Sequence, residues 1–392
     1  MKLVIVVPDG MCDWRYAELG NLSPAEYANT PGMDKIVARG GVGLAKTMHA
    51  GLPLGSLVGL LGIYGYYPPD YFPLGRSIFE AAALGIKVSP HDLVCRCNIV
   101  RVGDDGKLAD FTANQISDQE ALAYLQALDL PPGVEIHHDL SYRNVLVYRD
   151  WPLNELGLTL FEPHENVGER LETILPLYQG QPYQPFVEMM QRSERRSLRR
   201  SLRDSQRGKR MLWPWGQGRI RQFPPMPFRS FTVTALSFLY GMAVSLGGDA
   251  VIPPGTTGYL GSDLGAKFQA VIKHLEEVDV CLVHCNAPDE EAHLHHIGGK
   301  VQAIEEIDRQ IVHPLLEALD DRGEPYRILL IPDHYTVCQT GRHVPDDVPY
   351  AVAGHGIERL HTLRAYSETD ILAARPAVIE SHHLISTLLG PG

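Results

Sequence analysis

Residues 2–8 read KLVIVVP, and Asp9 and Gly10 follow directly. The run is apolar after its first residue and rich in β-branched side chains, which is typical of a strand buried on both faces of a parallel sheet. In open α/β sheets the carboxyl ends of the strands carry the chemistry. Asp9, at the end of this strand, is therefore the first candidate site residue.

The same pattern returns near the end of the chain. Residues 278–285 (VDVCLVHC) and 327–332 (RILLIP) are apolar runs, and Asp333 and His334 follow the second of them at once. Residues 301–319, which lie between the two runs, have helical periodicity. This alternation predicts an α/β fold with a doubly wound, mostly parallel sheet and helices on both faces.

The middle of the chain follows a different pattern. A short strand is expected at residues 143–149 and an amphipathic helix at residues 117–128. We interpret residues 93–210 as an inserted, smaller α+β domain that binds substrate or closes over it. The core domain would then consist of residues 1–92 and 211–392.

Composition narrows the function classes. Of the 392 residues, 44% are hydrophobic and 21% are charged, which is ordinary for a globular protein. The net charge of −12 argues against a nucleic-acid partner, because nucleic-acid binding needs a basic surface. The N-terminal residues do not read as a signal sequence and no apolar run is as long as a membrane span, so we expect a cytoplasmic protein with no membrane partner. The sequence specifies no oligomeric state.

Six cysteines are spread along the chain, at positions 12, 95, 97, 281, 285 and 338. None forms a CxxC pair, and most lie in or beside apolar runs. We expect buried, reduced thiols, as in a cytosolic protein.

Seven arginines recur at three- and four-residue spacing between residues 192 and 207, so a helix would place them on one face. The simplest interpretation is a solvated helix surface. A phosphate-collecting face that closes over the active site, or a contact with nucleic acid or a protein partner, are the alternatives.

The chemistry is carried by a set of acidic, histidine and serine residues at strand ends and tight turns. Ser56 ends the turn GLPLGS, Asp289 and His293 are spaced to share one helical face, and His343 follows Asp333 and His334. Carboxylates and imidazoles are ligands for divalent cations. Two cations about 3.5–4 Å apart could hold both the attacking and the leaving oxygen of a phosphoryl transfer. A serine beside them becomes a usable nucleophile.

Ten motifs together resemble the archaeal-type cofactor-independent phosphoglycerate mutases of the alkaline phosphatase superfamily. They are residues 6–10 (VVPDG), 53–56 (PLGS), 75–85 (GRSIFEAAALG), 96–98 (RCN), 141–144 (SYRN), 215–218 (WGQG), 255–260 (GTTGYL), 287–300 (APDEEAHLHHIGGK), 300–308 (KVQAIEEID) and 333–337 (DHYTV). The resemblance implies an alkaline-phosphatase-like fold. It also implies interconversion of 2- and 3-phosphoglycerate through a phosphoserine, without 2,3-bisphosphoglycerate as a cofactor.

The resemblance also implies roles for individual residues. Asp289, His293 and His343 would hold one divalent cation. Asp9, Ser56, Asp333 and His334 would hold the other, with Ser56 as the nucleophile. The substrate, a small phosphorylated hydroxy acid, would contact Arg96, Arg143 and His164. Mn²⁺ is the expected cation, with Mg²⁺, Zn²⁺ or Co²⁺ as alternatives.

The segment after Ser56 departs from the family pattern. Family members place an acidic residue directly after the serine and a polar residue soon after, whereas this chain continues with Leu57 and an apolar run to Leu61. Two further functions are therefore considered. One is a related phosphotransferase or phosphomonoesterase, for example a homoserine-kinase-like enzyme. The other is a homologue that binds metal without catalysis.

Overall fold

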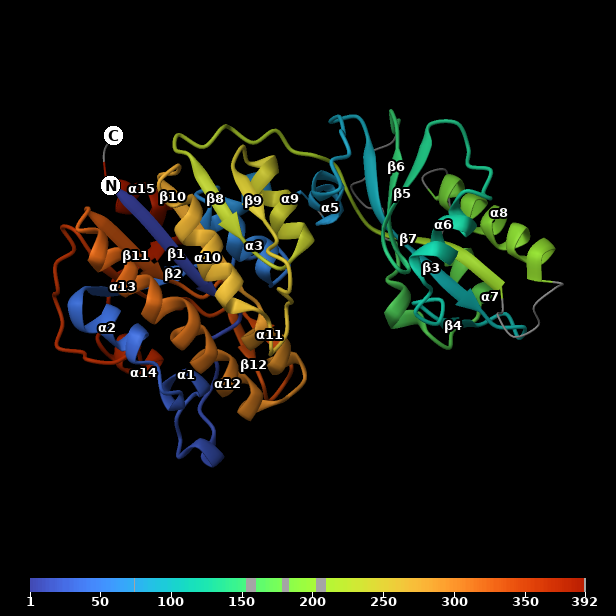
Figure 1. The fold of residues 1–392 in the computed structure, drawn as a ribbon. Helices are drawn as coiled ribbons and strands as arrows, with labels where there is room; N and C mark the ends of the chain where they lie inside the picture. The colour runs from blue at the N-terminus through green and yellow to red at the C-terminus, as the bar shows by residue number, and fades with distance from the viewer. Residues whose placement is uncertain (74, 153–159, 178–182, 202–208, 391–392) are drawn as a thin grey trace. The chain divides into compact units, whose positions relative to one another are not determined.

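The computed structural model describes residues 1–73, 75–152, 160–177, 183–201 and 209–390. The chain forms two compact units (Figure 1). The first consists of Met1–Phe72 and Phe223–Gly392, and the second consists of Pro73–Gln222.

The first unit contains an eight-stranded sheet with the order β15-β2-β14-β11-β1-β10-β8-β9. Its strands are β1 (Lys2–Pro8), β2 (Gly41–Lys46), β8 (Ser230–Val233), β9 (Asp249–Val251), β10 (Val280–Cys285), β11 (Tyr326–Leu330), β14 (Val348–Gly354) and β15 (Val378–Glu380). The expected central strand, β1, lies between β10 and β11 and is parallel to both. β14 alone runs antiparallel to its two neighbours, β11 and β2, so the sheet is mixed but mostly parallel, which confirms the predicted fold class.

Helices cover both faces of this sheet. One face packs against α2 (Pro31–Arg39), α10 (Leu264–His274), α12 (Ile297–Ile307) and α13 (His313–Arg322), seen in front of the sheet in Figure 1. Phe231 and Val233 point into that core. Thr232 lies between them and points the opposite way, and its hydroxyl meets the Tyr64 hydroxyl at 2.6 Å. This contact places α3 (Ser56–Ile63), which ends just before Tyr64, on the other face.

The helix expected at residues 301–319 is part of a longer helical region. α12 continues into a π-helical segment, η4 (Asp308–Val312), and then into α13. Pro314 stands in the first turn of α13 and has no backbone N–H, so a regular helix cannot continue unchanged across it.

The second unit is built on an antiparallel sheet. Its strands are β3 (Leu93–Val102), β4 (Leu108–Asp110), β5 (Val134–Leu140), β6 (Arg143–Tyr148) and β7 (Lys209–Gly218), with β3 paired to β4, β6 and β7. Its longer helices are α5 (Ser77–Ala83), α6 (Asp118–Leu125) and α8 (Gln184–Ser201). The strand and the helix expected in this region are β6 and α6.

The boundaries of the second unit differ from those expected at residues 93 and 210. The Ser77 hydroxyl of α5 donates to the Val94 carbonyl of β3 at 3.0 Å, so α5 belongs to this unit. A side chain at Gly75 would stand 2.6 Å from the Gln217 carbonyl, so the two backbones pack closely. Such contacts join segments far apart in sequence, and neither composition nor periodicity marks them.

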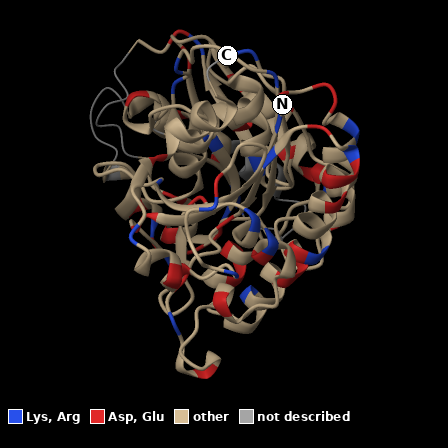
Figure 2. Ribbon diagram, turned by 90° about the vertical axis from the view of Figure 1, so that its left-hand side faces the viewer, with Lys and Arg blue, Asp and Glu red and all other residues tan. Residues whose placement is uncertain are grey.

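Further expectations concern the cysteines, membrane spans, the distribution of charge and the arginine-rich stretch. All six cysteines are buried and unpaired, as predicted. Among the described residues, no helix is long and apolar enough to cross a membrane. Figure 2 shows acidic and basic residues interspersed along the ribbon, so the net negative charge is not confined to one element. The side chains of most of the arginine-rich stretch, from residue 195 onwards, lie outside the described residues.

Candidate metal centre

Two neighbouring strands bring Asp9, Asp333 and His334 together. β1 and β11 are parallel with Val6 opposite Leu330, and the three residues follow the ends of these strands. Their side chains are completely buried. The Gly10 N–H donates to Asp333 Oδ1 at 3.1 Å, which fixes that carboxylate beside the end of β1.

Ser56 is the first residue of α3 and faces these groups. Its hydroxyl oxygen lies 3.4 Å from both carboxylate oxygens of Asp9 and 3.2 Å from His334 Nε2. Gly55, just before it, has φ 143°, a conformation that strongly favours glycine. Asp9, Ser56, Asp333 and His334 together form the deep cluster.

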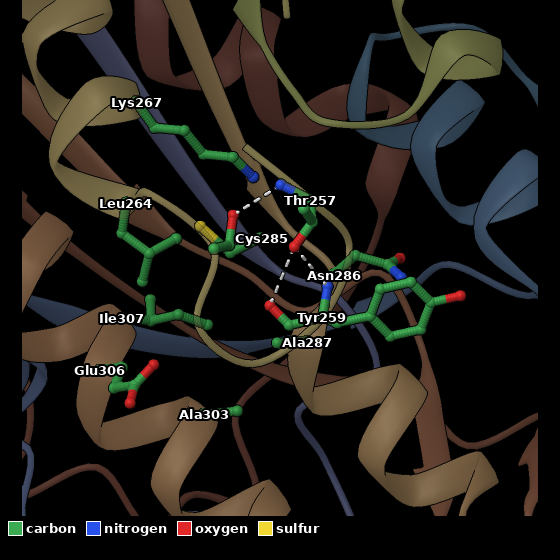
Figure 3. A pocket seen from close by; sticks show the side chains of 11 residues that line it. Thr257, Tyr259, Leu264, Lys267, Cys285, Asn286, Ala287, Ala303, Glu306 and Ile307 are labelled. Carbon is green, nitrogen blue, oxygen red and sulfur yellow. Dashed lines mark hydrogen bonds between the residues drawn. The ribbon is translucent and has the colours of Figure 1, made fainter. Parts of the chain in front are cut away.

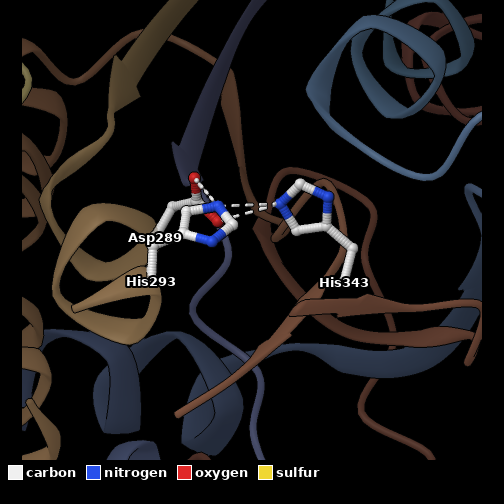
Figure 4. Close-up of side chains that lie close together, drawn as sticks. All are labelled: Asp289, His293 and His343. Carbon is white, nitrogen blue, oxygen red and sulfur yellow. Dashed lines mark hydrogen bonds and ion pairs between the residues drawn. The ribbon is translucent and has the colours of Figure 1, made fainter. Parts of the chain in front are cut away.

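Asp289, His293 and His343 form a second group, the outer cluster. α11 (Ala287–His293) places Asp289 and His293 on one face, and β13 (Arg342–Val344) supplies His343. His293 Nε2 lies 3.2 Å from Asp289 Oδ2 and 3.2 Å from His343 Nε2, while His343 Nε2 lies 3.4 Å from Asp289 Oδ1. Figure 4 shows these atoms turned toward one another.

The other nitrogen of each outer histidine is held by the backbone. His293 Nδ1 donates to the Gly341 carbonyl at 2.8 Å, and His343 Nδ1 donates to the Leu54 carbonyl at 3.2 Å. In each ring Nε2 therefore faces Asp289, where it can donate to the carboxylate or, without its proton, offer a lone pair to a cation. Ring orientation by a second hydrogen bond is common for metal-binding histidines.

Thr336, in β12 (Tyr335–Val337), connects the two clusters. Its hydroxyl donates to Asp289 Oδ1 at 2.6 Å, so its oxygen can accept from His334 Nδ1 at 3.0 Å. The second bond leaves His334 Nε2 unprotonated and facing Ser56. A side chain at Gly10 would meet the Thr336 hydroxyl at 2.5 Å, so Gly10 makes room for this bridge. Thr336 was not predicted as a site residue, because a threonine in a short strand carries no sequence signal of its own.

His284 is a second residue near the clusters that was not predicted from the sequence. It lies in β10 and is completely buried, with Nε2 3.0 Å from Asp9 Oδ2. The available signal was a histidine in the otherwise apolar run that ends β10. Its carbonyl accepts a hydrogen bond from the buried Lys267 amine at 2.7 Å.

A small pocket lies next to this strand end but is separate from the clusters. Thr257, Ser262, Lys267 and Asn286 are among the residues that line it (Figure 3). None of the residues predicted for the metal centre lines the pocket.

The protonation of the clusters follows from burial and from repulsion between carboxylates. Burial, together with the charges of Asp333 and Asp289, raises the pKa of Asp9 well above its usual value. Burial would also raise the pKa of Asp289, but hydrogen bonds from His293 and His343 hold it well below the usual range. The hydrogen bond to Asp289 raises the pKa of His293 to about 9, despite partial burial. Burial lowers the pKa of His334.

These residues fit divalent cations. Donor atoms bound to one cation at about 2.1 Å lie about 3.0–3.4 Å apart, and the Ser56, His293, His334 and His343 contacts given above measure 3.2–3.4 Å. Asp289, His293 and His343 can offer one donor atom each within 4.8 Å of one another, and so can Asp9, Asp289 and His334. Asp333 Oδ2 is buried without a hydrogen-bond partner, as expected of an atom whose natural partner is an ion.

The residues expected to contact substrate lie in the second unit. Arg96 donates to Glu80 at 3.0 Å and its guanidinium lies 4.0 Å above the Trp215 ring. His164 packs its ring on the same Trp215, with ring centres 5.6 Å apart. Arg143 is exposed on β6, with its guanidinium 5.6 Å from the Tyr142 ring. Trp215 thus brings Arg96 and His164 together.

Known proteins resemble the chain along its whole length. Residues 38–201 match the family model described as 2,3-bisphosphoglycerate-independent phosphoglycerate mutase. The 2,3-bisphosphoglycerate-independent phosphoglycerate mutase 2 of Methanothermobacter thermautotrophicus is 34% identical over 403 residues, covering 100% of this chain and 98% of the relative.

Two solved structures share the fold. The PH0037 protein from Pyrococcus horikoshii has a TM-score of 0.77 at 23% identity and covers 99% of this chain and 96% of its own. The cofactor-independent phosphoglycerate mutase from Thermoplasma acidophilum has a TM-score of 0.67 at 20% identity and covers 99% of both chains.

Proposed function

The chain belongs to the family of 2,3-bisphosphoglycerate-independent phosphoglycerate mutases, and from this premise we propose that it interconverts 2- and 3-phosphoglycerate with Ser56 as the phosphate carrier. The observation that carries the role of Ser56 is its position: the hydroxyl lies within 3.4 Å of Asp9 and His334, inside a set of buried cation donors.

The reaction has two matching halves. The Ser56 oxygen attacks phosphorus in line, the bond from phosphorus to the substrate oxygen breaks, and the released oxygen ends with the proton that Ser56 carried. In the second half, the other hydroxyl of the same glycerate attacks phosphoserine, and Ser56 regains a proton. Ser56 opens α3, so the first amides of this helix face the phosphate that the residue would carry.

Two divalent cations fit this scheme. The outer cation would be held by Asp289, His293 and His343, and the deep cation by the residues of the deep cluster. Bound cations would neutralise charge on the phosphoryl oxygens and lower the pKa of the serine hydroxyl. The mixture of carboxylate oxygens and imidazole nitrogens suits Mn²⁺ first, with Co²⁺, Zn²⁺ or Mg²⁺ as alternatives.

The substrate side of the proposal names Arg96, Arg143 and His164. A guanidinium presents paired donors that match a carboxylate or a phosphate. Phosphoglycerate carries both groups, so two arginines can bind its two ends. The packing of Arg96 on Trp215 supports this role, because it holds the guanidinium in one orientation.

A coupled mutase assay tests the proposal. The metal-stripped protein is given 3-phosphoglycerate and one of Mn²⁺, Mg²⁺, Zn²⁺ or Co²⁺, without 2,3-bisphosphoglycerate, while free phosphate is measured in parallel. We expect cation-dependent formation of 2-phosphoglycerate with little phosphate released. Release of phosphate without formation of 2-phosphoglycerate would contradict the mutase proposal and indicate a phosphomonoesterase.

A further inference from the structure

His284 lies behind the deep cluster on the face of the sheet that carries Ser56. In β10, Cys281, Val283 and Cys285 point into the core beneath α10 and α12. His284 alternates with them and therefore points toward the opposite face, where α3 lies. It pairs with Val7 of β1, and the Asp9 N–H donates to the Cys285 carbonyl at 2.9 Å, so Asp9 and His284 are held side by side.

The ring of His284 has no conventional partner. Both its nitrogens are buried and make no hydrogen bond with any described residue, although Nε2 lies only 3.0 Å from Asp9 Oδ2. Asp333 Oδ2 is unpartnered in the same way. Leaving a buried polar group without a partner costs about 1–3 kcal/mol. His284 Nε2 and Asp333 Oδ2 lie at one place and indicate a missing partner that these two atoms share, because one cation can bind only one nitrogen of an imidazole.

That partner has to be positively charged. Asp9, His284 and Asp333 can offer one donor atom each within 4.8 Å of one another. Two of these residues are carboxylates, and two carboxylates beside an imidazole nitrogen form a donor set that a divalent cation binds. A neutral imidazole has a free lone pair, which is what a cation needs from a histidine.

We propose that His284 is an additional donor to the deep cation, on the buried side away from the substrate. The inference rests on the proposed two-cation function and adds a nitrogen ligand to Asp9, Ser56, Asp333 and His334. A second imidazole moves the preference of the site from Mg²⁺ toward Mn²⁺, Co²⁺ or Zn²⁺, since Mg²⁺ favours oxygen ligands.

The first test compares wild type with His284→Phe, which keeps a flat ring but removes both nitrogens. The proteins are stripped with chelator and titrated with Mn²⁺ by calorimetry. We expect two Mn²⁺ ions in wild type and at least a tenfold loss of affinity at one site in the variant. The melting temperature of the metal-free variant should not fall, because the lost nitrogens had no partner. His355→Phe, at an exposed position, is the matched control and should bind Mn²⁺ as wild type does.

The second test counts nitrogen ligands. In a His293→Ala/His343→Ala background only the deep cation should bind, and pulsed electron paramagnetic resonance of Mn²⁺ should report two coordinated nitrogens. Adding His284→Phe, or His284→Gln if the first variant does not fold, should leave one. An unchanged nitrogen count overturns the assignment, even if affinity falls. If wild type binds no Mn²⁺ at all, the proposed two-cation function fails instead.

Discussion

The deep and outer clusters contain similar ligand types in opposite surroundings. The side chains of Asp9, Asp333 and His334 are completely buried, whereas His293 is 37% and His343 21% exposed. In the outer cluster, Asp289 is balanced by its histidines, one of which has a raised pKa. In the deep cluster the carboxylates repel each other and the pKa of Asp9 is raised.

The two clusters differ in how their negative charge is balanced when no cation is bound. The outer cluster can exist without its cation, because a protonated histidine can take the cation's place beside Asp289. The deep cluster carries charge that no neighbouring histidine neutralises, so its charged form depends on a bound cation. We therefore expect chelators to remove the outer cation first and the deep cation to contribute more to stability.

The largest expected effect is that of Ser56→Ala, which removes the proposed phosphate carrier from the deep cluster. Mutase turnover should fall by at least about 1,000-fold, since no other hydroxyl is proposed to accept the phosphate. Cation content, measured by elemental analysis, should remain close to two per chain because the carboxylates and histidines stay. Full activity in this variant would refute the role of Ser56.

A pair of substitutions tests the contrast directly. Asp333→Asn should abolish binding of one cation and activity together, while the metal-free protein becomes no less stable, because a repelling buried charge is gone. Asp289→Asn should also lose a cation, but it should destabilise the metal-free protein by about 1–2 kcal/mol, because it weakens bonds to His293, His343 and Thr336. Urea unfolding in chelator measures both. Equal stability changes, or unchanged metal stoichiometry, would contradict the distinction between the clusters.

The substitution Thr336→Val tests whether cation binding at one cluster depends on the other cluster. It removes the hydroxyl that joins His334 to Asp289 but keeps the shape of the side chain, so cation affinity should fall about 10–100-fold at both sites. Calorimetric titration with Mn²⁺ provides the measurement. Thr336→Ser keeps the hydroxyl and should bind nearly as wild type does. A loss confined to one cluster would show that Thr336 orients a single ligand and does not couple the two.

The last expected effect concerns the pH dependence of stability, at a buried carboxyl outside both clusters. Burial raises the pKa of Glu368 from 4.5 to about 7. Because the folded state holds this proton more tightly, the free energy of unfolding should fall by about 1.4 kcal/mol per pH unit between roughly pH 4.5 and 7 and then level off. Urea unfolding across this range, with and without Mn²⁺, measures the slope.

Glu368→Gln should remove the part of the pH dependence of the unfolding free energy that comes from this carboxyl. Binding of Mn²⁺ should not change that part in wild type. The pH dependence that comes from Asp9, in contrast, should diminish when Mn²⁺ binds. A Glu368 contribution that responds to Mn²⁺ would place this carboxyl in the metal centre.

The sequence by itself determined the parts of the molecule that depend on local order. Apolar runs ending in Asp9 and Asp333 predicted parallel strands whose carboxyl ends meet, and the four-residue spacing of Asp289 and His293 predicted their shared helical face. The resemblance to known mutases supplied the family and grouped Ser56 and His343 with these residues. The structure brings all of them within hydrogen-bonding distance of a neighbour in the set.

Only the tertiary structure decided which side chains support that set. Thr336 and His284 matter because β12 and β10 place them against Asp289 and Asp9, residues distant in sequence or on another strand. The unit boundary at residue 73 and the packing of Arg96 on Trp215 are likewise contacts between separate segments. Periodicity and spacing report the face on which a residue lies, but not the partner that faces it, because that partner is fixed only when the chain packs.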